Sequence, residues 1–554
     1  MDVTAVIGNG NSMPMGVRKL PDNAGCGSLI DELLVAEAYP HPVAHLELRQ
    51  THISWIVLTG SFAYKIKKPV HYDFIDAATL ERRHHLCDEE LRLNRRFAPD
   101  LYVDVVPIVR EDGRLRVGGA GVPVEYAVRM HEFDPSQQLA TRLAQLGVAP
   151  DDMRGLAARL ADAHLRAAVA PSCGPCGTVD AVRQPMLGNF RLLRAHLGDA
   201  GRLRKLERLA RWTDDSLTRL APLINSRLQS GMVRECHGDL HARNIVRWQQ
   251  QWMPFDCLEF DPMLRWIDVI SDVAFLFMDL TSRGRADLAC EFISRYLEET
   301  GDYEGLRLLP LYAAYLALVR AKVDALGAEG AGPDERLALE ARLAERLETA
   351  LHFMQARPTT LVIMHGVTAS GKSWLSERLV SALPALRIRS DLERKRLAGV
   401  APLARRVFGI GEGAYAPAAT AATYQRLLAC AEAALDGDCN VVIDASFLDP
   451  AHREMFRALA QRRHCRYLIV CCVTDPATLQ TRLRTRARSG LDPSEATREV
   501  LEQQLGTLQP LTADEQSYVV QVDTRGVGTA DAAMLQVRTR LESAACQQEN
   551  QGPS

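Results

Sequence analysis

The sequence predicts a multidomain α/β protein with two main domains. Its 554 residues exceed what one hydrophobic core usually holds. Along the chain the apolar residues follow first a strand pattern, then a helical spacing, and finally a regular alternation of strands and helices. We therefore expect a two-lobed α+β domain over residues 28–350 and a domain with a parallel sheet over 359–545, together with a flexible leader at 1–27 and a tail at 546–554.

The first domain contains two regions of different pattern. Up to about residue 135, the strand-like runs HISWIVLTG, AYKIKKPV, LYVDVVPIV and VEYAVRMHEF flank one helical segment, TLERRHHLCDEELRLNRRF. This pattern predicts a small antiparallel sheet with a helix packed on it. After residue 136 the apolar spacing of three and four residues predicts a helical lobe. Inside it, CHGDLHARNIVRW and MPFDCLEFD predict a short loop-and-hairpin insert.

From residue 359, strand-like runs alternate with amphipathic helices. The runs TTLVIMHG, LRIRSD, NVVIDASF and RYLIVCCV are apolar without the polar alternation of a half-exposed strand. Such strands, joined by helices, indicate a parallel sheet that is covered by helices on both faces.

Composition excludes several classes of protein. A net charge of -3 gives no electrostatic reason to expect nucleic acid or an anionic membrane as a general partner. No apolar run approaches the roughly 20 residues of a membrane span. We expect a cytoplasmic protein whose 13 cysteines stay reduced. The CxxC in SCGPCG follows a helical stretch and precedes a loop, so we interpret it as a turn and not as a thiol-redox motif. The sequence does not define an oligomeric state.

The stretch CHGDLHARNIV, residues 236–246, gathers polar residues between apolar ones. A sheet lobe, a helical lobe and this loop together resemble protein-kinase-like folds. Glycine in place of the protein-kinase arginine, and the helix-rich second lobe, resemble the aminoglycoside phosphotransferase family. The resemblance implies that Asp239 accepts the proton of the acceptor hydroxyl, and that Asn244 and Asp256 bind magnesium.

The same resemblance implies a lysine that binds the nucleotide phosphates and pairs with a helix glutamate. Of the lysines in AYKIKK, Lys65 matches best by its place in the strand, and Glu90 is preferred to its neighbour Glu89. A Gly-rich phosphate loop of kinase form is not visible, because LTGSFAY has only one glycine. Asp272, in SDVAF, resembles an aspartate that braces the catalytic loop.

The segment GVTASGKS, residues 366–373, has the pattern of a P-loop. It follows a strand and opens a helix, which is the context that this motif requires. The pattern predicts that backbone N–H groups cradle phosphate, that Lys372 reaches the β and γ phosphates, and that the hydroxyl of Ser373 holds magnesium. The predicted nucleotide-binding residues are Gly366, Ala369, Ser370, Gly371, Lys372 and Ser373.

Three further segments resemble parts of small P-loop kinases. After the second strand, Asp391 and Arg394 take the places of a catalytic base and a substrate anchor. Asp444, at the end of the third strand, resembles a magnesium-binding Walker B acid. Arg482 and Arg486 resemble lid arginines that neutralise the transferring phosphoryl group.

The whole chain resembles a bacterial fusion of an aminoglycoside phosphotransferase-like domain with a C-terminal P-loop kinase domain of AAA, zeta-toxin or gluconate kinase type. This resemblance implies ATP and Mg²⁺ at two sites and a small-molecule acceptor. Three hypotheses stay open: phosphotransfer at one or both sites, an N-terminal domain that binds a ligand and regulates the P-loop domain, and a kinase for nucleic-acid 5'-hydroxyl ends. The acidic net charge opposes the last one.

Overall fold

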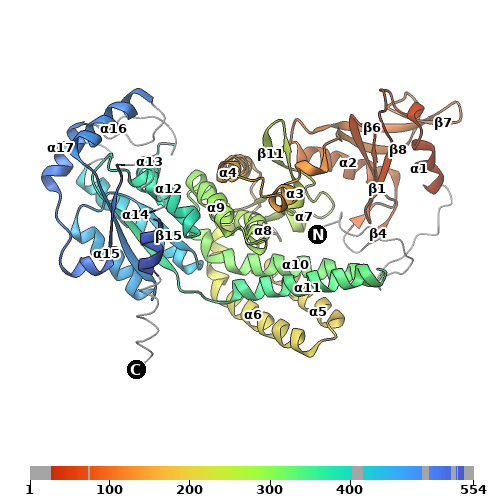
Figure 1. Cartoon of the computed structure of the whole chain (residues 1–554). Helices are drawn as coiled ribbons and strands as arrows, with labels where there is room; N and C mark the ends of the chain where they lie inside the picture. The colour runs from red at the N-terminus through yellow and green to blue at the C-terminus, as the bar shows by residue number, and fades with distance from the viewer. Residues whose placement is uncertain are drawn as a thin grey trace. The chain divides into compact units, whose positions relative to one another are not determined.

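The computed structural model of the chain is drawn in Figure 1. It describes residues 26–72, 75–401, 416–489, 498–525, 532 and 534–541. The predicted tail, and the predicted leader except for its last two residues, lie outside the described residues. The predicted multidomain α/β class is confirmed.

The chain divides into two compact units, and each of them is discontinuous in sequence. The first unit comprises Met1–Arg283 and Leu311–Met354, and the second comprises Gly284–Pro310 and Gln355–Ser554. The segment 284–310 lies inside the range that the sequence assigned to the N-terminal domain. In the structure it belongs to the C-terminal unit.

The small lobe of the first unit is an antiparallel sheet of six strands in the order β1-β2-β3-β8-β6-β7. Helix α2 packs against β8, β6 and β3, and the Thr79 side chain caps it by accepting from the backbone N–H of Arg82. Figure 1 shows this lobe in red and orange. Its elements are α1 (Cys26–Leu33), η1 (Ala36–Ala38), β1 (Glu47–Gln50), β2 (Ser54–Leu58), β3 (Phe62–Lys67), β4 (His71–Tyr72), β5 (Ile75–Asp76), α2 (Leu80–Asn94), β6 (Tyr102–Glu111), β7 (Arg114–Val117) and β8 (Pro123–His131).

The second lobe is mainly helical, as expected, and the β10–β11 hairpin directly follows the loop that carries Asp239 and Asn244. Helix α8 is buried along nearly its whole length, so it forms the centre of this lobe. The elements are η2 (Pro135–Gln137), α3 (Leu139–Ala144), α4 (Pro150–Arg166), α5 (Val179–His196), α6 (Ala200–Gln229), β9 (Val233–Glu235), η3 (Ala242–Asn244), β10 (Ile245–Trp248), β11 (Gln251–Pro254), α7 (Pro262–Arg265), β12 (Trp266–Asp268), α8 (Val269–Ser282), α10 (Leu309–Ala328) and α11 (Pro333–Met354).

The second unit is built on a five-stranded sheet in the order β14-β15-β13-β16-β17, and every neighbouring pair is parallel. All six residues of β13 are buried, which fits its central place. Its elements are β13 (Thr360–His365), α12 (Lys372–Ala382), β14 (Ala385–Arg389), α13 (Ser390–Leu397), α14 (Pro417–Asp436), β15 (Asn440–Asp444), α15 (Pro450–Arg462), β16 (Arg466–Val473), α16 (Pro476–Ser489), α17 (Arg498–Thr507), η6 (Asp514–Tyr518) and β17 (Val519–Asp523).

The segment 284–310 adds α9 (Ala286–Thr300) and η4 (Tyr303–Leu308) to this second unit. Helix α9 packs against β14 and α12, and η4 packs against α14. Hydrogen bonds connect the same elements. The Ser294 hydroxyl accepts from the backbone N–H of Arg387 at 3.2 Å, and the Arg426 guanidinium donates to the carbonyl of Gly301 at 2.8 Å. The segment is therefore an integral layer of the P-loop unit.

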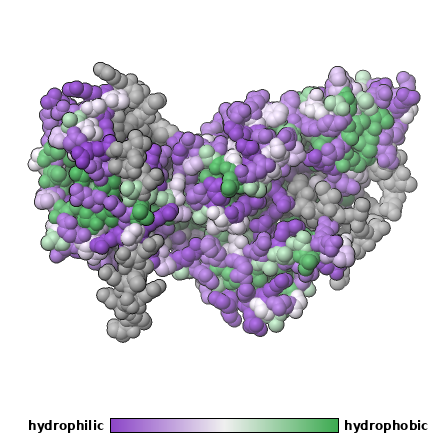
Figure 2. Space-filling view, viewed as in Figure 1, coloured by the Kyte–Doolittle hydropathy of each residue, from purple (hydrophilic) through white to green (hydrophobic). Residues whose placement is uncertain are grey.

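The visible surface is mixed in character. Figure 2 shows hydrophilic residues over most of it, with apolar residues gathered in smaller areas. The large apolar side chains that are most exposed among the described residues are scattered over separate elements, for example Val122, Leu146 and Leu337. In the described part of the chain, no helix combines the length and the apolar character needed to cross a membrane.

Removal of the segment 284–310 should destabilise the P-loop unit. A fragment of residues 359–554 should unfold at a temperature about 10 °C or more below that of the same fragment with 284–310 joined to it by a Gly/Ser linker. The reason is that loss of α9 and η4 exposes apolar surface on β14, α12 and α14. Thermal unfolding followed by circular dichroism measures the difference. Equal unfolding temperatures would show that the segment is dispensable for this unit.

Candidate functional site

A cavity of about 380 Å³ lies in the first unit, and residues of both lobes line it. Four of the predicted site residues are in its wall, namely Lys65, Asp239, Asn244 and Asp256. The rest of the wall is largely apolar and includes Ile53, Ile56, Leu58, Ala63, Met130, Phe133, Phe255, Leu258 and Phe260. A mostly apolar pocket with a few convergent polar groups is the usual form of a small-ligand site.

Lys65 lines this cavity and makes two ion pairs. Its Nζ is 2.8 Å from Oε1 of Glu90 on α2 and 2.5 Å from Oδ1 of Asp256. Burial opposes the charge of Lys65, but Asp256 and Glu90 outweigh it, so the pKa of the lysine is well above its usual value. The structure thus brings together the strand lysine and the helix glutamate that the sequence paired.

Asp256 sits at the end of the β10–β11 hairpin with a left-handed backbone, φ 65°. Its backbone N–H donates to the hydroxyl of Tyr102 at 3.2 Å, and the N–H of Cys257 donates to Oδ1 of Asn94 at 3.0 Å. These two bonds fix the segment to the small lobe, and this supports the unusual backbone conformation at Asp256.

Asp239 and Asn244 lie together in the loop between β9 and β10. Nδ2 of Asn244 donates to Oδ2 of Asp239 at 3.0 Å and to its carbonyl oxygen at 3.1 Å. Nε2 of His241 is 3.4 Å from the same Oδ2. Because its nitrogen is used on Asp239, the amide oxygen of Asn244 is the atom available to a cation. The loop therefore presents one oriented carboxylate and one amide oxygen.

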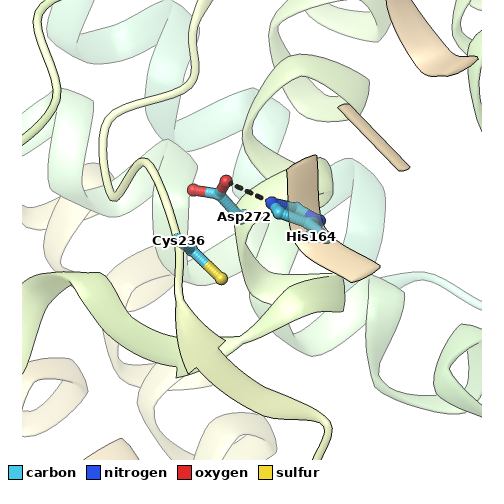
Figure 3. A group of neighbouring side chains, drawn as sticks. All are labelled: His164, Cys236 and Asp272. Atoms are coloured by element: carbon cyan, nitrogen blue, oxygen red, sulfur yellow. Dashed lines mark hydrogen bonds and ion pairs between the residues drawn. The ribbon is translucent and has the colours of Figure 1, made fainter. Parts of the chain in front are cut away.

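Asp272, on α8, holds the catalytic loop in place. Its Oδ1 accepts from the backbone N–H of Gly238 at 2.8 Å, and its Oδ2 accepts from the N–H of His237 at 3.2 Å. His164 on α4 approaches Oδ2 at 3.0 Å, and Figure 3 shows the ring facing the carboxylate. This geometry matches the bracing role expected for Asp272.

His164, Asp272 and the neighbouring Cys236 also form a compact group whose possible ligand atoms lie within 4.8 Å of one another. A structural zinc ion normally takes four ligands, and this group offers three among the described residues. Both oxygens of Asp272 already accept hydrogen bonds, and burial raises the pKa of the Cys236 thiol well above its usual value. The group fits a loop brace better than a metal site.

Neither turn next to β2 is a Gly-rich loop, in agreement with the sequence. The only glycine of LTGSFAY, Gly60, lies in the β2–β3 turn, where its N–H donates to Glu132 at 2.7 Å. The β1–β2 turn borders the cavity instead. In that turn the N–H groups of Ile53 and Ser54 donate to the hydroxyl of Thr51. Those two amides are thus committed within the turn.

In the second unit the P-loop follows β13 and opens helix α12, as predicted. Gly366, Ala369 and Gly371 have positive φ values of 143°, 60° and 92°. Glycine adopts this conformation easily, whereas Ala369 adopts it at a cost. Nζ of Lys372 donates to the carbonyl of Val367 at 2.8 Å, across the loop. Ser370 is buried, and Ser373 is partly exposed in the first turn of α12.

Arg482 contacts the P-loop from α16. Its guanidinium donates to the carbonyl of Ala369 at 3.2 Å and to both oxygens of Thr524. The Thr524 hydroxyl donates in turn to the carbonyl of Ser370 at 2.7 Å. Thr524 follows β17, a strand that the sequence analysis did not identify, so this residue was missed. The side chain of the second predicted arginine, Arg486, lies outside the described residues.

The remaining predicted residues lie at the carboxyl ends of β14 and β15. Arg394 faces Asp391 one helical turn away, with Nη1 3.8 Å from Oδ1. Asp444 ends β15 and is buried, and its carbonyl accepts from the hydroxyl of Ser390 at 3.0 Å. Because parallel strands end at one edge of a sheet, these residues share the edge that carries the P-loop.

Both sites have the donor sets that ATP and Mg²⁺ require. At the first site, Lys65 supplies a cation for phosphate, and Asp256 and the amide of Asn244 supply oxygen ligands for magnesium. At the second, the positive φ values of the P-loop and the start of α12 form an anion-binding cradle. Ser373 and Asp444 offer oxygen atoms that a magnesium ion could take as ligands there. The residues present therefore fit the two predicted groups.

The double pairing of Glu90 predicts a pH-dependent stability. Burial raises its pKa, but Lys65 and Lys67 outweigh this and lower it to about 2, against 4.5 for a free glutamate. Since the folded value is the lower one, the stabilisation is complete above pH 4.5 and is lost as the pH falls toward 2. Glu90→Gln should therefore lower the free energy of unfolding at pH 7 by roughly 3 kcal/mol.

Urea unfolding of wild type and Glu90→Gln at several pH values measures this effect. The difference in the free energy of unfolding between the two proteins should shrink below pH 4.5. The matched control is Glu340→Gln, at an exposed glutamate. A difference that stays constant from pH 7 to pH 3 would contradict the prediction.

The chain is similar to several known proteins. A family model described as an AAA domain matches residues 361–511. Among solved structures, an aminoglycoside phosphotransferase from Alicyclobacillus acidocaldarius is similar over 58% of this chain and 93% of its own length, with 14% identity and a TM-score of 0.34. A gluconokinase from Sinorhizobium meliloti is similar over 35% of this chain and 99% of its own length, with 22% identity and a TM-score of 0.25.

One relative covers most of the chain. An uncharacterized protein of Mycobacterium tuberculosis is 30% identical over 455 residues, which are 82% of this chain and 89% of the mycobacterial protein. Residues 361–511 match the AAA domain model, and the chain belongs to the same family as this mycobacterial protein.

Proposed function

We propose that the protein is an ATP-dependent phosphotransferase with two nucleotide sites, which transfers the γ-phosphate to a hydroxyl group of a small molecule. The observation that carries this proposal is the convergence of Lys65, Asp239, Asn244 and Asp256 on one cavity. These residues come from distant parts of the sequence, and together they are the minimum set that phosphoryl transfer in a kinase-like fold uses.

In the N-terminal site each residue has a separate role. Asp239 accepts the proton of the acceptor hydroxyl, because its carboxylate faces the cavity and is oriented by Asn244. Lys65 binds the nucleotide phosphates. Asn244 and Asp256 hold Mg²⁺, which neutralises the charge of the phosphates when it is bound. The apolar wall of the cavity has the character that an adenine ring requires.

In the C-terminal site the P-loop cradles the phosphates, and Lys372 moves from the carbonyl of Val367 to the β and γ groups. Ser373 and Asp444 hold the metal ion. Asp391 is the proposed base and Arg394 the proposed acceptor anchor, and their mutual approach supports assigning them to one subsite. We assign Arg482 and Arg486 to stabilisation of the transferring phosphoryl group. A cytoplasmic location, as expected from the sequence, would supply ATP to both sites.

A second candidate function is a regulatory N-terminal unit that binds a ligand without turnover. One observation favours it, namely the β1–β2 turn whose amides are bound to Thr51 and not directed to phosphate. A third candidate, a kinase for nucleic-acid 5'-hydroxyl ends, rests on Asp391 and Arg394 in the C-terminal unit. The net charge of -3 disfavours it.

The full chain with Mg²⁺ and γ-labelled ATP should be incubated with aminoglycosides, sugars, nucleosides and 5'-hydroxyl oligonucleotides. Label transfer to a small hydroxyl compound is the expected result. Calorimetry should give two ATP sites for each chain, and a single site would contradict the two-site proposal. Transfer to oligonucleotides alone would support the third candidate function. Variants of the full chain are preferable to fragments, because residues 284–310 belong to the C-terminal unit.

The Asp239→Asn substitution should lower phosphotransfer at the N-terminal site by about a hundredfold or more, since general base catalysis has that size. ATP affinity and thermal stability should change little, because asparagine retains an oxygen that can accept from Asn244. Asp256→Ala should in contrast weaken Mg²⁺-dependent ATP binding. Steady-state kinetics and calorimetry in a Lys372→Ala background separate the two effects. Unchanged turnover in Asp239→Asn would remove the catalytic role from this loop.

The Lys372→Ala substitution should abolish ATP turnover at the C-terminal site and leave the chain folded. The lysine amine is the point charge that the P-loop offers to the β and γ phosphates, and in the structure it donates to the carbonyl of Val367 at 2.8 Å. Calorimetry should count one ATP site fewer than in wild type. Retention of both sites with wild-type affinity would argue against nucleotide binding by this loop.

A further inference from the structure

Two lysines, not one, converge on Glu90. Lys65 and Lys67 are two residues apart on β3, so their side chains project from the same face of the sheet. Nζ of Lys65 is 2.8 Å from Oε1 of Glu90, and Nζ of Lys67 is 2.5 Å from Oε2. Each oxygen of this carboxylate thus has its own lysine. Kinase-like phosphate binding requires only one of them.

The two lysines differ in their access to the cavity. Lys65 lines the cavity wall, whereas Lys67 is not among the residues that line it and has a side chain that is 0% exposed. Lys67 therefore cannot reach a bound nucleotide without leaving the core. Its second partner is Glu259, whose Oε1 accepts from Nζ of Lys67. Lys67 is consequently a buried bridge between two carboxylates.

Glu259 is anchored firmly at its backbone. The guanidinium of Arg265 donates to the carbonyl of Glu259 at 3.0 Å and to that of Leu258 at 3.4 Å. Two residues earlier, the N–H of Cys257 donates to Asn94 on α2. The chain from Asp256 to Glu259 is therefore fixed at both ends, and Glu259 offers Lys67 a partner whose position is set by the fold.

The charges of this group explain why a second pair is useful. Lys65 and Lys67 face the three carboxylates of Glu90, Asp256 and Glu259. To bind phosphate, Lys65 must turn from Asp256 to the nucleotide, and this weakens its hold on Glu90 as well. A buried carboxylate that loses its only cation is strongly disfavoured. With Lys67 in place, Glu90 keeps one cation while Lys65 exchanges partners.

We propose that Lys67 and Glu259 form a second, buried ion pair that positions Glu90, and through it Lys65, for binding the nucleotide phosphates. Lys67 and Glu259 are thus positioning residues and not catalytic ones. The inference rests on the proposed nucleotide site of the N-terminal unit. Glu259 also lines the cavity, between Leu258 and Phe260, but Met130, Phe133 and Phe255 of the apolar wall lie outside this ion-pair network. The proposal therefore predicts a defect that is larger for ATP, which needs Lys65, than for adenosine.

The test uses the full chain with Lys372→Ala, so that the remaining ATP site is the N-terminal one. Calorimetry gives the dissociation constants of ATP with Mg²⁺ and of adenosine. Lys67→Met should weaken ATP binding by about tenfold to a hundredfold, the factor expected when a charge-assisted hydrogen bond is lost. Adenosine binding should stay within about twofold. A merely structural role would weaken both ligands alike.

Two further variants complete the design. The double variant Lys67→Met with Glu259→Gln removes one positive and one negative charge, so a defect in its ATP binding cannot come from a changed net charge. Because it replaces the buried ion pair as a whole, it should stay folded even if Lys67→Met alone unfolds. The control Lys205→Met breaks an exposed ion pair with Glu348 in the same unit and should change neither constant.

The outcomes separate the two proposals. If the Lys372→Ala background binds no ATP, the proposed N-terminal nucleotide site fails, and the positioning role fails with it. If the background binds ATP and the folded double variant binds it equally well, or if adenosine binding falls as much as ATP binding, the site stands and the positioning role of Lys67 and Glu259 is wrong.

Discussion

The N-terminal site depends on the hydrogen bonds that the carboxylate of Asp272 accepts. Its two oxygens take the backbone N–H groups of His237 and Gly238, which immediately precede Asp239. Burial raises the pKa of Asp272, but the hydrogen bond and charge of His164 outweigh this and lower it. A buried carboxylate with three polar partners is costly to displace, so these bonds favour the loop conformation that the structure shows. The orientation of Asp239 and Asn244 toward the cavity follows from that anchor.

Helix α8 carries a second aspartate that binds the same loop. Asp279, two turns after Asp272, accepts from the backbone N–H of Ala242, so one helix holds the catalytic loop at both of its ends. The chain then passes through residues 283–285 into α9, which packs on β14 and α12 of the P-loop unit. Helix α12 begins with Lys372. The two units are consequently not a simple tandem along the chain, because residues 284–310 of the P-loop unit are inserted within the sequence of the first unit.

Local pattern was sufficient to predict much of this structure. The strands around Lys65, the helix with Glu90, the loop with Asp239 and the P-loop all have short-range signals of periodicity or motif. What the sequence could not supply was pairing over distance. Lys67 and Glu259 are separated by 192 positions, and Thr524 lies 154 positions from the P-loop residue Ser370 that it contacts. The pattern of α9 shows that it is amphipathic, but not which unit it covers.

In the nucleotide site proposed for the first unit, a side chain takes the place of a Gly-rich phosphate loop. A Gly-rich loop binds phosphate through backbone N–H groups, and the β1–β2 turn uses two of these groups on Thr51. In the proposed nucleotide site, recognition of phosphate then falls to Lys65, whose charge is shared between Glu90 and Asp256. Exchange of Asp256 for a nucleotide phosphate replaces one ion pair by another, so the net gain is small unless Glu90 stays fixed. The rigidity of the ion-pair network therefore matters more in this site than in one where a loop of amides shares the task.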